Sequence, residues 1–185
     1  DAQQVVETEF GYLGFARLAI MGLTPDGMQP FQRDGSWVIC NGEIYGFRKI
    51  KKELEERGYQ FQSGSDCEVL LPLYEEYGLE MFSHLDAEYA CVLYDHKSGK
   101  LIAARDQIGI RPLFYGYSKS GKIAFASEAK NLIGWVDEVR AFPPGSYYYD
   151  GKFVKYEDIA AVHGYVHEDI DVITKNIHDK LTEGV

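Results

Sequence analysis

The segment spanning residues 37–45 constrains the fold most, because an apolar run is broken there by small and polar residues. Residues 37–40 are apolar and partly β-branched, a pattern that predicts a buried strand. Burial cannot explain the following Asn41-Gly42-Glu43. Asn-Gly is a strong signal for a tight turn, so the first interpretation is a β-turn at the end of the strand.

A second interpretation makes Asn41 and Gly42 an oxyanion hole, a pair of donors for negative charge that develops on a reacting carbonyl. An Asn amide carries two N–H donors, and a glycine lets a backbone N–H approach a ligand closely. Such donors must be fixed on a rigid element, which the end of a buried strand provides. These residues alone leave both interpretations open.

Length and composition indicate one compact domain rich in β-sheet. The 185 residues are 45% hydrophobic and include 14 Tyr and 10 Phe, and aromatic residues are favoured in strands. The net charge of −10 argues against nucleic acid as a partner, since phosphate binding needs clustered Lys and Arg. Without a long apolar run or a signal peptide, we expect neither a membrane span nor secretion, and the cytoplasm is the expected compartment.

Periodicity and turn residues predict short helices and strands along the chain. Residues 46–56 form an amphipathic pattern that ends before Gly58. A second helix is predicted at 65–78, with Ser65 and Glu68 in capping-box spacing and a kink at Pro72. Residues 22–35 are predicted to be a loop. Strands are predicted at 12–21, 89–94, 101–105, 113–117 and 123–126, short helices at 79–85 and 129–134, and a hairpin within 142–155.

Six blocks of sequence occur in an order that is typical of one family. The blocks are Phe15-Ala16-Arg17-Leu18-Ala19-Ile20, Cys40-Asn41-Gly42-Glu43-Ile44-Tyr45, Gly64-Ser65-Asp66-Cys67-Glu68, residues 105–113, Ala126-Ser127-Glu128-Ala129-Lys130 and residues 142–147. Together they resemble the glutaminase half of glutamine-hydrolysing asparagine synthases, a class II amidotransferase domain. The resemblance implies an α+β fold of the N-terminal-nucleophile (Ntn) hydrolase type, a four-layer sandwich of two antiparallel β-sheets faced by helices. Periodicity alone supports only a mixture of helices and strands.

The resemblance also implies roles for particular residues. Asn41 and Gly42 would form the oxyanion hole, Asp66 would bind the α-ammonium group of glutamine, and Glu43 would assist on that group or orient the amide. Arg17 would bind the α-carboxylate, beside a pocket wall formed by the backbone of Leu18, Ala19, Ile20 and Met21. The family usually has His-Glu before this arginine, whereas this chain has Phe15-Ala16.

Two of these residues have ordinary structural alternatives. An arginine among apolar strand residues is often held in an internal salt bridge, which is the alternative for Arg17. An acidic residue in the first turn of a helix is favoured by the helix dipole, which is the alternative for Asp66.

The nucleophile that the family uses is not in this sequence. Class II amidotransferases begin with a cysteine, whereas Asp1 corresponds to the aspartate that closes the Arg-Gly-Pro-Asp motif of the family. Cys40, Cys67 and Cys91 lack metal-ligand spacing and are expected to be buried thiols. No metal site is expected, since His163 and His167 lack a suitable cluster of carboxylates. We therefore expect that the 185-residue chain releases no ammonia from glutamine.

We expect residues 1–165 to be the amidotransferase domain and residues 166–185 to begin a helix that leads to an ATP-dependent synthetase domain. That domain, with its ATP and Mg²⁺, would be the partner within the same polypeptide and would use the ammonia to amidate activated aspartate. No cofactor is expected in the chain itself, and a homodimer is compatible with the resemblance. Two alternatives stay open: a domain that binds glutamine without hydrolysing it, and another class II amidotransferase.

Overall fold

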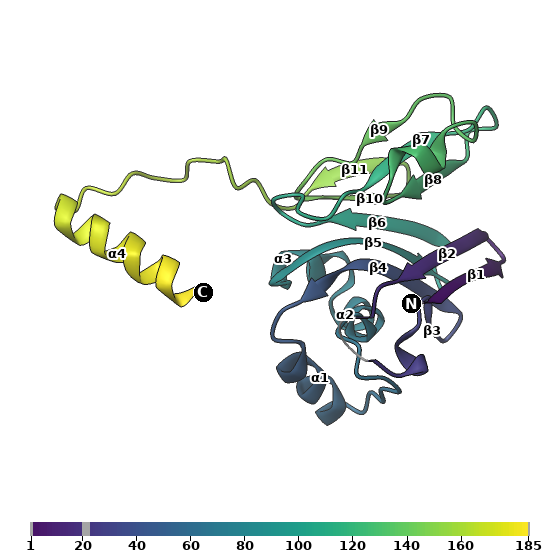
Figure 1. Cartoon of the computed structure of the whole chain (residues 1–185), viewed down its shortest axis with the longest axis horizontal. Coiled ribbons are helices and arrows are strands. Elements are labelled where there is room, and N and C mark those ends of the chain that lie inside the picture. Colours follow the sequence, from purple (N-terminus) through teal and green to yellow (C-terminus); the bar gives the residue numbers. More distant parts are fainter. Residues whose placement is uncertain (1, 20–22, 185) are drawn as a thin grey trace.

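The computed structural model describes residues 2–19 and 23–184, and a six-stranded antiparallel sheet lies at its centre. The strand order is β11-β10-β6-β5-β4-β3 (Figure 1). The strands are β3 (Phe31–Arg33), β4 (Ser36–Ile44), β5 (Ala87–Asp95), β6 (Lys100–Arg105), β10 (Ser146–Tyr149) and β11 (Lys152–Lys155). Each pairing is antiparallel and joins strands rich in aromatic and β-branched residues, as expected for a sheet that is buried on both faces.

The helices with buried residues all pack on one face of this sheet. They are α1 (Phe47–Glu56), α2 (Leu70–Tyr77) and α3 (Met81–His84), with 3₁₀ turns η2 (Cys67–Val69) and η3 (Gly78–Glu80) before α2 and α3. Their apolar side chains form the first core with Val38 and Cys40 of β4 and with Cys91 and Leu93 of β5. Because side chains alternate along a strand, these residues share one face of the sheet.

A second layer of strands covers the opposite face. It consists of a three-stranded sheet with order β8-β7-β9 and a separate β1–β2 hairpin (Figure 1). The strands are β1 (Ala2–Thr8), β2 (Gly11–Arg17), β7 (Phe114–Tyr117), β8 (Ile123–Ala126) and β9 (Arg140–Ala141). Leu113, Phe142 and Tyr148 are buried in a second core between the six-stranded sheet and this layer. The expected α+β sandwich class is confirmed, with its second sheet divided into two parts.

The interpretation of Asn41-Gly42 as a turn is wrong. β4 continues through both residues to Ile44, with Asn41 opposite Ala90 and Gly42 opposite Tyr89 in β5. The long partner strand β5 overrides the local turn preference, since a continuous ladder satisfies backbone groups that a turn would leave unpaired.

The second predicted helix begins differently from the prediction. The capping box is wrong, because the Glu68 carboxylate accepts from the N–H groups of Gln62 and Ser63 at 2.7 and 2.9 Å, both upstream of the helix. The segment forms the turn η2 and then α2, which begins at Leu70. Pro72 therefore lies in the first turn of α2, where a missing N–H costs little.

Other differences lie at the edges of the sheets. The predicted strand 12–21 is β2 and ends at Arg17, and residues 20–22 lie outside the described residues. β1 and β3 were not predicted, and the latter lies with the 3₁₀ turn η1 (Pro25–Gly27) inside the predicted loop 22–35. The predicted helix 129–134 is the 3₁₀ turn η4 (Ala129–Leu132).

The C-terminal helix α4 (Ile170–Glu183) lies apart from the sheets, at the end of an extended segment (Figure 1). Asp169 caps it by accepting from the N–H of Asp171 at 3.0 Å. Its apolar side chains Ile170, Ile177 and Leu181 are exposed. The predicted division of the chain after residue 165 stays a prediction.

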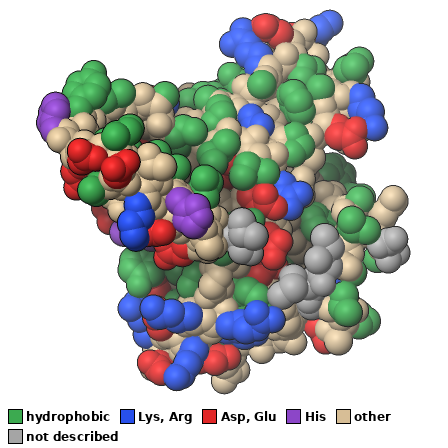
Figure 2. Space-filling model, turned by 60° about the vertical axis from the view of Figure 1, so that its left-hand side comes forward, with side chains coloured by type: hydrophobic (Ala, Val, Ile, Leu, Met, Phe, Trp, Pro, Cys, Tyr) green, Lys and Arg blue, Asp and Glu red, His purple; other side chains and the backbone are tan. Residues whose placement is uncertain are grey.

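The surface of the molecule carries many charged side chains. Basic and acidic side chains gather together at the lower end of the molecule, where α1 lies (Figure 2). This mixture agrees with the solvated face that the amphipathic pattern of α1 predicts. Among residues 2–19 and 23–184, no helix is both long enough and apolar enough to cross a bilayer.

Candidate glutamine site

A cleft of ≈ 760 Å³ opens between the β1–β2 hairpin, the second half of β4 and the segment that follows β8. Its lining brings together residues that are far apart in the sequence. Six of the predicted site residues line it: Arg17, Leu18, Asn41, Gly42, Glu43 and Asp66. The sandwich thus places three separate sequence blocks around one hollow.

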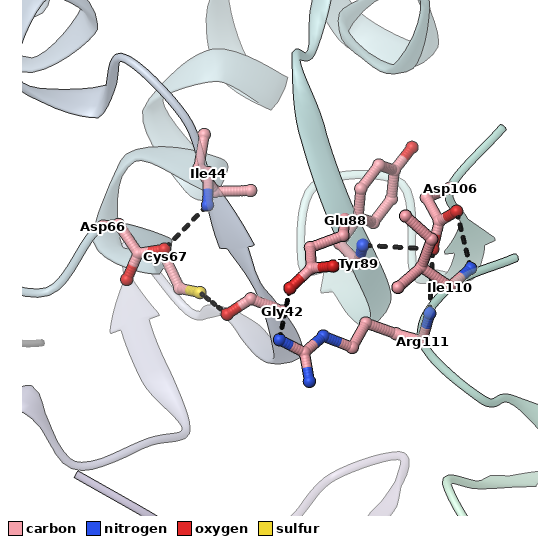
Figure 3. Close-up of polar contacts among 9 residues, drawn as sticks. All are labelled: Gly42, Ile44, Asp66, Cys67, Glu88, Tyr89, Asp106, Ile110 and Arg111. Atoms are coloured by element: carbon pink, nitrogen blue, oxygen red, sulfur yellow. Dashed lines mark hydrogen bonds and ion pairs between the residues drawn. The ribbon is translucent and has the colours of Figure 1, made fainter. Parts of the chain in front are cut away.

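On the outer edge of β4, the backbone N–H groups on both sides of Gly42 donate hydrogen bonds to side chains. The Gln29 side chain pairs with the backbone of Cys40, accepting from its N–H at 2.7 Å and donating to its C=O at 3.1 Å. The N–H of Ile44 donates to Oδ2 of Asp66 at 2.8 Å (Figure 3). Cys40, Gly42 and Ile44 alternate along the strand, so the N–H of Gly42 points to the same edge. It lies between the two contacts, and Gly42 lines the cleft. The carbonyl of Gly42 accepts from Sγ of Cys67 at 3.9 Å.

Close packing against β5 explains why residue 42 is a glycine. A Cβ at this position would lie 2.3 Å from the carbonyl oxygen of Glu88 and 2.7 Å from the Cα of Tyr89. From the sequence, this glycine was predicted to let a ligand approach the backbone closely. The structure shows that a side chain at residue 42 would also clash with β5, whether or not a ligand binds.

Alternation along β4 also fixes where the side chains of Asn41 and Glu43 point. Val38 and Cys40 belong to the first core, whereas Ile39 packs against the second core on the opposite face. Asn41 and Glu43 share the face of Ile39 and are both half-buried. Their polar groups therefore lie on the side of the sheet where the cleft opens.

Asp66 is 5% exposed, at the point where η2 begins. Its side chain makes no capping hydrogen bond to η2 and instead binds β4 through Oδ2. Within the described part of the chain, Oδ1 makes no hydrogen bond, which leaves one carboxylate oxygen available at the cleft wall. The position at a helix start is as predicted, but the contact is with the sheet.

Arg17 ends β2 and lines the cleft opposite β4. Its Nη1 donates to the carbonyl of Thr24 at 3.0 Å, so this guanidinium also has a structural contact. Leu18 lines the cleft, whereas Ala19 is half-buried and is not part of the lining. Ile20 and Met21 lie outside the described residues.

A polar centre that was not predicted from the sequence lies behind Arg111, which lines the cleft. Asp106, 1% exposed, accepts hydrogen bonds from five backbone N–H groups, those of Ile108, Gly109, Ile110, Arg111 and Tyr89. Figure 3 shows the contacts with Ile110, Arg111 and Tyr89. The neighbouring Arg105 donates to the carbonyls of Arg111, Phe142 and Gly109 at 2.7 to 2.8 Å. The block 105–113 was recognised in the sequence, but the path of its backbone was not, and it is this path that turns four N–H groups of the block toward Asp106.

All three cysteines are buried free thiols, as predicted. A hydrogen bond with Cys67, together with burial, raises the pKa of Cys40 well above its usual value. Burial and the nearby Cys67 raise the pKa of Cys91 to about 12. These two groups therefore remain protonated at neutral pH and are unsuited to nucleophilic attack, which needs an exposed thiolate. The described residues contain no group of three or more His, Cys, Asp or Glu side chains placed to hold a metal ion.

Comparisons with known proteins identify relatives of this chain that act on glutamine, in agreement with the cleft described above. The family described as glutamine amidotransferase domain matches residues 1–152. The chain is 45% identical over 154 residues to a probable glutamine-hydrolysing asparagine synthetase of Acanthamoeba polyphaga mimivirus, covering 80% of this chain and 28% of that protein. It is 33% identical over 186 residues to asparagine synthetase B of Escherichia coli, covering 97% of this chain and 32% of that protein.

A solved structure shows the same fold. The glutamine phosphoribosylpyrophosphate amidotransferase of B. subtilis superposes with a TM-score of 0.66 at 25% identity, over 80% of this chain and 35% of that chain. The chain thus spans about a third of the length of the relatives that it matches. These relatives confirm the resemblance to the glutaminase part of glutamine-hydrolysing asparagine synthases. The chain belongs to the glutamine amidotransferase domain family.

Proposed function

We propose that the cleft binds glutamine and that the full-length protein hydrolyses the side-chain amide there, as the glutaminase part of an asparagine synthase. The observation that carries the proposal is the edge of β4. There, Gly42 lines the cleft, and its N–H lies on the outer edge of β4 between the hydrogen-bonded N–H groups of Cys40 and Ile44. The side chains of Asn41 and Glu43 lie on the adjoining face of the sheet. A rigid donor aimed into a cleft is what stabilisation of an oxyanion requires.

The two ends of the cleft suit a zwitterion. Arg17 lies on the side of the β1–β2 hairpin and suits the α-carboxylate, since a guanidinium binds a carboxylate through two parallel hydrogen bonds. Asp66 and Glu43 lie on the side of β4 and suit the α-ammonium. Asp66 offers the oxygen Oδ1, while its other oxygen is fixed by Ile44. The amide carbon would then lie near the donors of Asn41 and Gly42.

In this proposal, the residues of the cleft bind glutamine and stabilise the oxyanion, and a cysteine thiolate of the full-length protein would be the nucleophile. A thiolate attacks the amide carbon, and the resulting oxyanion accepts hydrogen bonds from the Asn41 side chain and the Gly42 N–H. Ammonia leaves with the proton of the thiol, and water then releases glutamate from the thioester. Cys40, Cys67 and Cys91 are buried and do not supply the thiolate. In the full-length protein, a synthetase domain with ATP and Mg²⁺ would use the ammonia to amidate activated aspartate.

Replacing Asn41 by alanine tests the oxyanion hole. We expect Asn41→Ala to lower kcat for glutamine-dependent synthesis by about 100- to 1,000-fold, the usual loss for one such donor. Synthesis from added ammonia should persist, because it bypasses this cleft. An equal loss with both nitrogen sources would show that Asn41 only supports the fold. Glutamine binding without release of glutamate by the unmodified protein would favour a binding domain instead.

A further inference from the structure

Two glutamate side chains are cross-strand neighbours beside the cleft, which Glu43 lines. Glu43 in β4 lies directly opposite Glu88 in β5, so their side chains share one face of the sheet. Like charges in this arrangement repel each other and destabilise the strand pair. The Glu88 side chain is only 18% exposed, which weakens the screening of this repulsion by water.

Arg111 compensates the pair, but it binds only one of its members. Its Nη2 lies 2.5 Å from Oε1 of Glu88 (Figure 3). Its Nε is buried and has no hydrogen-bond partner within the described part of the chain. The guanidinium therefore has unused donor capacity at the wall of the cleft, which Arg111 lines together with Glu43.

The backbone of Arg111 is held on both sides. Its N–H donates to Oδ2 of Asp106 at 3.1 Å, and its C=O accepts from Nε of Arg105 at 2.7 Å. Asp106 and Arg105 are themselves anchored by several further hydrogen bonds. With the backbone fixed, rotation of the side chain decides which carboxylate Arg111 binds.

The hydroxyl of Tyr45 lies near the same three charges. Burial raises the pKa of its hydroxyl, the negative charges of Glu88, Glu43 and Asp86 raise it further, and the positive charge of Arg111 opposes them. Glu43, Glu88 and Arg111 thus act on the same hydroxyl. Because Glu43 is the direct cross-strand neighbour of Glu88, the Arg111 guanidinium that binds Glu88 lies on the same face of the sheet as both carboxylates.

We propose that Glu88 is a positioning residue, which holds Arg111 away from Glu43 and so keeps the Glu43 carboxylate available for the α-ammonium of glutamine. This inference rests on the proposed function. Without Glu88, the unused donors of Arg111 would turn to Glu43, the nearest remaining carboxylate across the strand pair. The substrate ammonium would then compete with an internal guanidinium for the same oxygens.

The test is a suppressor experiment on glutamate release by the full-length protein. We expect Glu88→Gln to raise the KM for glutamine by about 10- to 100-fold, with kcat changed much less. This range corresponds to the loss of one hydrogen bond to a charged group, here the bond between Glu43 and the substrate ammonium. Adding Arg111→Met to this variant should return the KM close to that of the unmodified protein, because the competing guanidinium is gone. The more conservative Glu88→Asp should give an intermediate KM.

Two controls separate the possible failures. Glu138→Gln breaks an exposed ion pair with Arg140 outside the cleft lining and should leave the KM unchanged.

Glu43→Gln should raise the KM by itself. If it does not, the proposed role of Glu43 in binding fails rather than the role of Glu88. If Glu43→Gln raises the KM but Glu88→Gln does not, the inference is overturned. A double variant as impaired as Glu88→Gln would also overturn it. Melting temperatures recorded for each variant identify any change that only lowers stability.

Discussion

Asp66 and Asp106 are both nearly buried carboxylates beside the six-stranded sheet, but they differ in how many N–H groups they bind. Asp106 accepts from five backbone N–H groups, and both of its oxygens are used. Asp66 accepts from one, through Oδ2, and lines the cleft. Asp106 is not part of the cleft lining.

The difference indicates how the two residues divide their roles. A carboxylate with every oxygen satisfied stabilises the loop that it organises and has little capacity left for a ligand. A largely buried carboxylate with an unused oxygen at a cleft keeps hydrogen-bonding capacity for a cationic ligand. Burial alone does not distinguish the two residues, since both are at most 5% exposed.

The largest effect on stability is expected at Asp106. Asp106→Ala leaves five N–H groups of a buried loop without their acceptor, so we expect the free energy of unfolding to fall by at least about 4 kcal/mol, the size typical of a broken buried network. Chemical denaturation of the purified protein measures this. A loss below about 1 kcal/mol would mean that water or a rearranged loop replaces the carboxylate.

A smaller loss is expected at Gln29. Its side chain makes two hydrogen bonds to the backbone of Cys40, and Gln29→Met, of similar size, would leave that N–H and C=O unpaired. We expect a decrease of about 1–3 kcal/mol in the free energy of unfolding, from the same denaturation measurement. An unchanged midpoint would show that this edge of β4 is accessible to water.

The smallest change in stability is expected at Asp66. Asp66→Asn keeps an oxygen that can accept from Ile44 and removes a buried charge, so the free energy of unfolding should change by less than about 1 kcal/mol. A loss as large as that expected for Asp106→Ala would remove the distinction between the two carboxylates and make Asp66 a structural residue.

Local sequence patterns predicted most of the strands and short helices. β5 and β6 were found because each has an apolar run bounded by turn residues, and the hairpin of β10 and β11 because Asp150-Gly151 marks its turn. The prediction of a turn at Asn41-Gly42 was wrong, because pairing with β5 outweighs the local preference of these two residues for a turn. Local patterns also missed β1, whose residues are mostly exposed and therefore lack a clear apolar period.

The family resemblance directed attention to Arg17, Asn41 and Asp66, and the structure brings them together at one cleft. Gln29 and Glu88 could not be found in the same way. Their partners, Cys40 and Arg111, lie 11 and 23 residues away and are joined to them only by the folding of the sheet. Contacts of this kind leave no local sequence pattern, so they require the structure.

Selectivity for the α-ammonium group is the most direct test that the cleft holds glutamine through Asp66. The measurement is a titration of the unmodified protein and of Asp66→Asn with glutamine and with 4-carbamoylbutanoate, which lacks only the α-amino group. We predict that the unmodified protein binds glutamine with an affinity about 30-fold or more higher than that for 4-carbamoylbutanoate. This ratio is consistent with the 2–5 kcal/mol typical for a buried charge pair. Asp66→Asn should lose most of this preference. Equal affinity of the unmodified protein for the two ligands, or an unchanged preference in Asp66→Asn, would contradict this prediction.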